Sequence, residues 1–320
     1  MKSKVKNFLY KKKQKFYRFP KNYLKNIFWE ENEDNMYYGH YDIFKAYTKS
    51  FLPFKINGEV QHGWAGKNSG IPIINEKLSK GPTHKRYYVF NETNKKICND
   101  IGYKNVIAIG APFIYLNDIY KPNIEYHPNS LILFPFHSTE WDPFTDSVRY
   151  YKEYLDELKE VISSFERVTV SLYYLEYDNI KIRKIFESKG INVITMGSRN
   201  YNPKFLFNFI DIVSKHEYVC SDTFSSAIFY SLFLKKKVFL FIGGMKNSNH
   251  YGNDFISRNL TYSKKYPGLL WNDFNHESHF YISHTELGLK YKKSPKELSL
   301  LFGWNLKETF RKTAKLLIST

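Results

Sequence analysis

Short apolar runs alternate with amphipathic runs along most of the chain, and each connection between them is short. The apolar runs are rich in branched and aromatic residues and predict buried strands at 58–64, 85–90, 104–110, 130–138, 167–174, 191–197, 217–221 and 236–241. The amphipathic runs predict helices at 36–51, 91–103, 147–165, 179–190, 203–216, 225–234, 294–304 and 306–320. Strands that alternate with helices in this way are typical of parallel sheets with right-handed crossovers.

The alternation pauses between 117 and 129, where two prolines and several turn-forming residues predict a linker. We therefore expect an α/β protein with two Rossmann-like domains that face each other across a cleft, followed by C-terminal helices. The expected division is a basic aromatic arm at 1–29, an N-terminal domain at 30–120, the linker at 121–130, a C-terminal domain at 131–300 and a last helix at 301–320. Because ligands of open parallel sheets bind at the carboxyl ends of the strands, residues that follow strands are the first candidates for a site.

The composition is that of a folded protein. Hydrophobic residues make up 42% and aromatic residues 18% of the 320 positions, which argues against disorder. The chain has no apolar run of about 18 residues, and its start lacks the apolar core of a signal peptide. Its two cysteines, Cys98 and Cys220, stand beside apolar residues and look like buried thiols of a reducing compartment. A cytoplasmic protein without a spanning helix is predicted.

The positive charge is concentrated at the N-terminus. The net charge is +17, and ten lysines and arginines precede the first acid, Glu30, so that the rest of the chain carries +7. Aromatic residues are interleaved with these charges. Three interpretations stay open for this arm: a solvated tail, a segment that binds the inner membrane surface at about 1 kcal/mol per basic residue, or a nucleic-acid contact.

A cluster of small polar residues lies between the strand at 217–221 and the helix that follows it. Ser221, Asp222, Ser225 and Ser226 all occur within six positions. The first turn of a helix has unpaired N–H groups and about half a positive charge, so added serine hydroxyls make a site for phosphate. The alternative is that one of these residues only caps the helix, which contributes about 1 kcal/mol.

Two further strand ends carry histidines. His137 and Ser138 follow the strand at 130–138 with Glu140 close behind, and His62 precedes Gly63 at the end of the first strand. Imidazole can take a proton near neutral pH, and glycine allows a ligand to approach the backbone. Both histidines could instead be buried and purely structural. No metal is expected, because the histidine pair at 276–279 lacks a third ligand and no Asp-x-Asp motif occurs.

Three stretches carry a resemblance to a known family: QHGWAGK at 61–67, GYKNVIAIGAPFIY at 102–115 and SDTFSSAIFYSLFLKKKVFLF at 221–241. They resemble motifs of the GT-B glycosyltransferases that build bacterial surface polysaccharides, and the first resembles the His-Gly turn of the CDP-glycerol glycerophosphotransferase type. The chain departs from that type at Trp64, where threonine is usual, and at Lys237, where proline is usual. The resemblance therefore leaves the donor open.

The resemblance implies transfer of a sugar from a CMP-, UDP- or CDP-linked donor to a glycan or lipid-linked acceptor, with no cofactor and no metal. It implies that the donor lies against the second domain and the acceptor against the first, and that the basic arm holds the enzyme at the inner face of the plasma membrane. The implied donor or phosphate ligands are Ser221, Asp222, Ser225, Ser226, His137 and Ser138; the catalytic candidates are His62 and Glu140; and the acceptor-side residues are Gly63, Trp64 and Lys67. Two alternatives remain: a CDP-polyol phosphotransferase, and a basic nucleic-acid-binding protein, although no nucleic-acid partner is expected.

Overall fold

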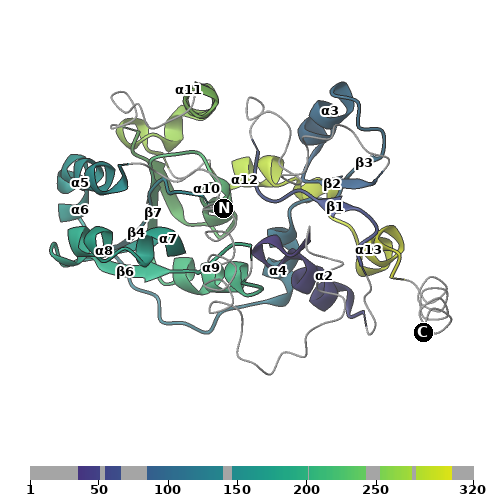
Figure 1. Ribbon diagram of the computed structural model, residues 1–320, viewed down its shortest axis with the longest axis horizontal. Coiled ribbons are helices and arrows are strands. Elements are labelled where there is room, and N and C mark those ends of the chain that lie inside the picture. The colour runs from purple at the N-terminus through teal and green to yellow at the C-terminus, as the bar shows by residue number, and fades with distance from the viewer. Residues whose placement is uncertain are drawn as a thin grey trace, which may run out of the picture.

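The computed structural model describes residues 35–50, 55–65, 85–139, 146–200, 202–242, 253–275 and 279–304. Two parallel sheets, each with its own helices, lie side by side in Figure 1. We call them the first and second units, in chain order. This architecture confirms the predicted α/β class with two parallel units. The predicted arm at 1–29, most of the last helix and two predicted site residues, Lys67 and Glu140, lie outside the described residues.

The first unit is built on a three-stranded sheet in the order β1-β2-β3, and all pairings are parallel. Asn91 caps α3, because its side chain accepts a hydrogen bond from the backbone N–H of Asn94 at 2.9 Å. The elements of this unit are η2 (Tyr37–Gly39), α2 (His40–Thr48), β1 (Glu59–Val60), β2 (Tyr87–Val89), α3 (Glu92–Asp100), β3 (Val106–Ala108) and α4 (Pro112–Ile119).

The second unit is a five-stranded parallel sheet in the order β6-β5-β4-β7-β8. The chain runs from the central β4 outward to β6, then returns to β7 on the other side of β4. The carboxyl ends of β4 and β7 are therefore neighbours, with Phe134 opposite Ser221, and they form the switch point at which such sheets bind ligands. The elements are β4 (Ser130–Phe134), α5 (Ser147–Glu157), α6 (Lys159–Ser163), β5 (Arg167–Leu172), α7 (Tyr174–Tyr177), α8 (Ile180–Glu187), β6 (Asn192–Thr195), α9 (Phe205–Ser214), β7 (Tyr218–Ser221), α10 (Ser226–Phe233) and β8 (Lys237–Leu240).

After the second sheet the chain returns to the first unit. Helix α12 packs against α10, and α13 packs against α2 of the first unit. The backbone N–H of Ala111 donates to the carbonyl of Leu287 at 2.8 Å, which joins α4 to the end of α12. The predicted domain boundaries stay a prediction. The elements of this part are α11 (Asn253–Lys265), η5 (Pro267–Leu269), η6 (Trp271–Asp273), α12 (Phe280–Glu286), η7 (Leu289–Tyr291) and α13 (Pro295–Phe302).

Several predicted elements differ in length from the observed ones. The helix predicted at 36–51 begins only at His40, because Tyr38 and Gly39 adopt left-handed backbone angles with φ of 55° and 78°. The helix predicted at 147–165 is divided at Leu158 into α5 and α6. The pattern did not predict α4, α7, α11 or α12. Within the described residues, no helix is both long and apolar enough to cross a membrane.

Candidate functional site

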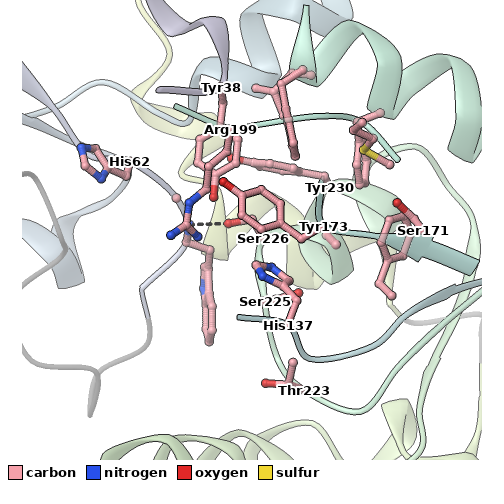
Figure 2. A pocket seen from close by; sticks show the side chains of 18 of the residues that line it. Tyr38, His62, His137, Ser171, Tyr173, Arg199, Thr223, Ser225, Ser226 and Tyr230 are labelled. Carbon is pink, nitrogen blue, oxygen red and sulfur yellow. Dashed lines mark hydrogen bonds between the residues drawn. The ribbon is translucent and has the colours of Figure 1, made fainter. Parts of the chain in front are cut away.

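A pocket of about 580 Å³ opens at the switch point of the second sheet and is lined by both units. The first unit contributes η2 and the turn that follows β1. The second contributes the segments that follow β4, β5, β6 and β7, together with the start of α10. The pocket lies at strand ends that the sequence argument considered, and Figure 2 shows the side chains that meet there.

The start of α10 forms one wall of this pocket. Ser225 is the residue before the helix and is extended, yet its hydroxyl makes no capping hydrogen bond. The capping alternative considered for Ser225 is therefore not what the structure shows, and its side chain lines the pocket instead. The hydroxyl oxygen of Ser226 accepts a hydrogen bond from the backbone N–H of Trp64 at 2.9 Å, which ties the tip of α10 to the first unit.

Ser221 and Asp222 lie behind the wall. The buried hydroxyl of Ser221 donates to the carbonyl of Phe134 at 2.6 Å. One oxygen of the buried Asp222 carboxylate accepts from the backbone N–H of Phe136 at 2.9 Å, and the other accepts from the hydroxyl of Tyr150. Neither side chain lines the pocket. These contacts join the loop after β7 to the loop after β4, so the two residues position the pocket wall.

His137 lines the pocket on the opposite side of the switch point, and its ring lies 4.8 Å from the ring of Tyr173. Its Nδ1 lies 2.6 Å from the carbonyl oxygen of Ser138, so Nδ1 donates and Nε2 carries the lone pair. Burial, with a smaller effect of the nearby Arg199 guanidinium, lowers the pKa of His137 to about 4. The imidazole is therefore neutral at pH 7. Ser138 is buried, and its backbone N–H donates to Glu176 at 2.8 Å.

His62 also lines the pocket, from the first unit. Its ring lies 3.5 Å from the ring of Tyr37, and Figure 2 shows it at the edge of the group, turned away from His137 and Ser225. Its Nε2 is buried without a hydrogen-bond partner among the described residues. Burial, followed by the nearby His40 and Arg199, holds the pKa of His62 well below its usual value. Its assignment as the base stays a prediction.

Arg199 is a pocket residue that the sequence argument missed. It follows β6, and its guanidinium carbon lies 5.6 Å from the centre of the Tyr173 ring. Its backbone carbonyl accepts a hydrogen bond from the N–H of Tyr38 at 2.6 Å, so the first unit helps to hold this loop. With both histidines neutral, Arg199 carries the only formal charge among the described lining residues, which include no carboxylate. Together with the start of α10 it makes the described pocket attractive to an anion.

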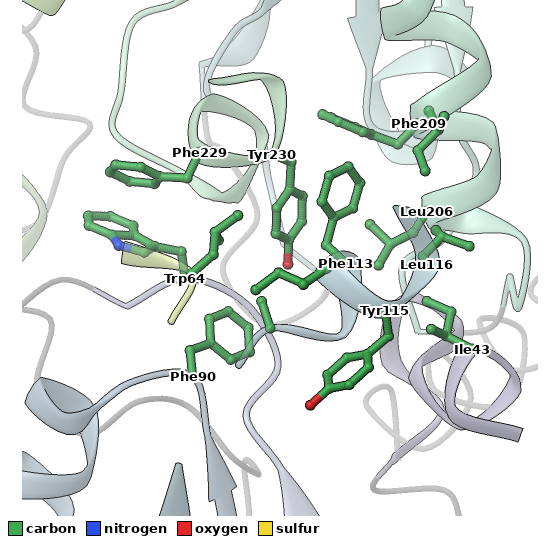
Figure 3. Packing of buried hydrophobic residues seen from close by; sticks show 14 of the residues in the cluster. Ile43, Trp64, Phe90, Phe113, Tyr115, Leu116, Leu206, Phe209, Phe229 and Tyr230 are labelled. Atoms are coloured by element: carbon green, nitrogen blue, oxygen red, sulfur yellow. The ribbon is translucent and has the colours of Figure 1, made fainter. Parts of the chain in front are cut away.

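Trp64 anchors the turn that carries His62 and Gly63. Its indole ring packs 4.5 Å from Phe229, as Figure 3 shows, and its Nε1–H donates to the carboxylate of Glu286 at 2.7 Å. It is only 7% exposed, although it contributes to the pocket wall. The contacts explain how the turn after β1 is fixed against α10 and α12.

Glu140 and Lys67, two further predicted site residues, lie outside the described residues. Within the described ranges, no group of three histidine, cysteine, aspartate or glutamate side chains is arranged to hold a metal ion. The absence of a metal from the reaction stays a prediction.

Comparison with known proteins leaves the family undefined. No protein-family model and no curated protein matches the chain. Among solved structures, the chain is similar to TarM, with 14% identity, a TM-score of 0.33, and coverage of 67% of this chain and 41% of that one. It is also similar to the wall teichoic acid polymerase TagF (H444N variant), with 13% identity, a TM-score of 0.35, and coverage of 73% and 57%. The chain spans only about half the length of these two proteins. Such distant likeness does not define a function, so the function is derived from the pocket itself.

Proposed function

We propose that the protein is a glycosyltransferase that moves a sugar from a nucleotide-activated donor to a glycan or lipid-linked acceptor in bacterial surface-polysaccharide synthesis. The observation that carries this proposal is the charge of the pocket. A guanidinium and a helix start converge at the switch point of a Rossmann-like sheet, and no carboxylate is found among the described lining residues. This arrangement suits the phosphate groups of a nucleotide and does not depend on a metal ion to neutralise them.

In the proposed complex the donor phosphate lies between the start of α10 and Arg199. The hydroxyl of Ser225, which makes no capping bond, donates to it, as does the guanidinium. As the bond between sugar and phosphate breaks, negative charge grows on the departing phosphate. Donors that are already in place stabilise this charge, which is often the largest contribution to such catalysis.

Two neutral imidazoles are available to accept the proton of the acceptor hydroxyl. His62 lines the edge of the pocket on the first unit and is the base that the sequence predicts. His137 lies on the second unit with its Nε2 lone pair unused by protein groups in the described structure. Lowered pKa values keep both rings unprotonated at neutral pH, and a base must be unprotonated to act. Replacing each histidine with glutamine and measuring single-turnover transfer separates the two roles.

Arg199→Gln tests the anion site, with Arg167→Gln as a matched control. Arg167 begins β5, at the end of the strand opposite to the pocket, and its guanidinium contacts His127. By calorimetry with CMP, CDP and UDP, we expect Arg199→Gln to weaken binding about 10- to 100-fold, because a charged hydrogen bond is worth about 1.5–3 kcal/mol. The control should bind like the wild type. Equal binding by all three proteins, or no nucleotide binding by the wild type, would refute the proposal.

The reaction is identified with a panel of CMP-, UDP- and CDP-linked donors, read by nucleotide release. Release from sugar-linked donors supports a glycosyltransferase, whereas release of CMP from a CDP-polyol alone identifies the phosphotransferase. Tight binding of random oligonucleotides that falls steeply with salt, without turnover of any donor, identifies a nucleic-acid-binding protein. We also propose that the arm at 1–29 places the enzyme at the inner membrane face; its deletion should reduce binding to anionic liposomes and leave turnover of a soluble acceptor unchanged.

A further inference from the structure

Three hydroxyl groups lie near the start of α10 where the two units meet, and two of them are beside Gly63. A β-carbon placed on Gly63 would lie 2.7 Å from the hydroxyl oxygen of Ser226 and 3.8 Å from that of Tyr38. Tyr230 lies one turn beyond Ser226 on the same helix and also lines the pocket. The hydroxyl of Ser226 accepts from Trp64 and keeps its own proton for a further bond. The missing side chain of Gly63 leaves room beside the hydroxyls of Ser226 and Tyr38.

Tyr230 supplies the evidence that the cluster meets a ligand. Its side chain is only 1% exposed. Its hydroxyl lies near that of Ser226 but makes no hydrogen bond of normal geometry to any described residue. Leaving a buried hydroxyl unpaired costs about 1–3 kcal/mol, so such groups in native proteins usually have a partner. Burial first, and then the nearby Tyr38 phenol, raise the pKa of Tyr230. The phenol thus stays protonated and can both donate and accept.

The chemistry of this cluster differs from that of the anion site beside it. Its three polar groups are uncharged hydroxyls, and aromatic side chains surround them: the Tyr38 ring packs against Phe205 at 5.1 Å, and Trp64 also lines the pocket. Neutral hydroxyls between aromatic faces match a ligand that has both hydroxyl groups and apolar C–H faces. A sugar ring has both of these features.

We propose that Tyr38, Ser226 and Tyr230 form a glycosyl subsite, which hydrogen-bonds the hydroxyl groups of a sugar ring held next to the anion site. This inference rests on the proposed function and goes beyond it by naming the residues that recognise the sugar. The ring belongs either to the donor or to the acceptor, and the experiment distinguishes the two. A site built to bond a hydroxyl discriminates strongly against ligands that lack it, so these residues also determine specificity.

Tyr230→Phe is the principal test, and Tyr103→Phe is its matched control. Tyr103 also buries a hydroxyl without a partner among the described residues, but it packs in the first unit against Tyr87, away from the pocket lining. Both variants remove one oxygen atom, so both should fold with an unchanged or slightly raised melting temperature. Calorimetry then compares CMP, CDP and UDP with their sugar-bearing counterparts.

For a donor sugar, Tyr230→Phe should bind the free nucleotide normally and the nucleotide sugar about 5- to 10-fold more weakly, while Tyr103→Phe binds both like the wild type. For an acceptor sugar, donor binding is unchanged and the acceptor KM rises by a similar factor. If neither quantity changes while the wild type turns over, the inference is overturned. If the wild type binds no nucleotide, the proposed function fails. Titration with glycan fragments then tests the subsite by itself. Weaker binding of these fragments by Tyr230→Phe than by the wild type supports the subsite, whereas equal binding, or no binding by either protein, overturns it.

Discussion

Replacing His40 with leucine should make the fold less sensitive to acid. His40 is the first residue of α2, its side chain is 0% exposed, and neither ring nitrogen has a hydrogen-bond partner among the described residues. It lies in the first unit, 5.7 Å from the ring of Tyr38. Burial without a partner disfavours the charged ring, and it lowers the pKa of His40 to about 3. The unfolded chain, in contrast, titrates near 6.5.

The sign follows from the order of these two values. Between pH 6.5 and about 3 the ring of His40 is protonated in the unfolded state but not in the folded state. The contribution of His40 to the free energy of unfolding is therefore fully present above pH 6.5 and is lost as the pH falls. Each unit of pKa difference corresponds to about 1.4 kcal/mol, so His40 should cost the wild type about 3 kcal/mol by about pH 4.5. Leucine has no proton to bind and removes this loss. The contribution of His137 is present in both proteins and cancels.

Urea unfolding of the wild type, His40→Leu and a control at about pH 7.5 and about pH 4.5 measures the effect. The control is His127→Leu, whose ring contacts Arg167 and is not enclosed in the core. The free energy of unfolding should fall by about 3 kcal/mol less in His40→Leu than in the other two. If acid destabilises all three proteins equally, His40 is either hydrogen-bonded or protonated in the folded state, and the reasoning is wrong.

Three other predictions concern the contact between the units and the pocket. Gly39→Ala should lower the melting temperature by more than Gly190→Ala does, as thermal melts would show. Both glycines have left-handed φ, but a β-carbon at Gly39 would lie 2.0 Å from the carbonyl oxygen of Pro203, whereas one at Gly190 would meet nothing within 4 Å. Trp64→Phe keeps the aromatic packing and removes the bond to Glu286, so chemical denaturation should show a loss of about 1.5–3 kcal/mol. On the acid side, kcat/KM should fall with an apparent pKa below 6.5, because burial lowers the pKa of both pocket imidazoles. An apparent pKa of 6.5 would contradict the assignment of either His62 or His137 as the base.

The strand ends of the second unit could be predicted because local patterns define them. An apolar run followed by small polar residues locates the end of β7, and the same pattern locates the end of β4. Which side chain enters the pocket could not be predicted in this way. Ser225 and His137 line it, whereas Ser221 and Asp222 turn into the wall. Apart from Ser221, the last residue of β7, these residues lie in loops after the strands. Side chains alternate with a fixed period only within a strand, so the pattern that locates the strand end does not say which loop side chain enters the pocket.

Arg199 was missed for a different reason. No motif surrounds it, and its place depends on a backbone bond to Tyr38, a residue more than 150 positions earlier in the chain. Tyr38 in turn depends on the left-handed turn that shortens the predicted helix at 36–51. The position of α13 against α2 is likewise set by contacts between distant parts of the chain. Periodicity records which face of an element is buried, and it does not record the element that covers that face.

The core shows how the pocket keeps its shape. One hydrophobic cluster runs from α2 and α4 of the first unit to α9 and α10 of the second. Within it, Phe113 stacks on Tyr230 with ring centres 4.2 Å apart and an angle of 12° between the rings (Figure 3). Units that share only a small polar contact usually move relative to each other, whereas a large apolar contact resists separation because opening would expose it to water. The described part of the pocket is therefore preorganised: the start of α10, Arg199 and the hydroxyls around Gly63 are held together before a ligand binds.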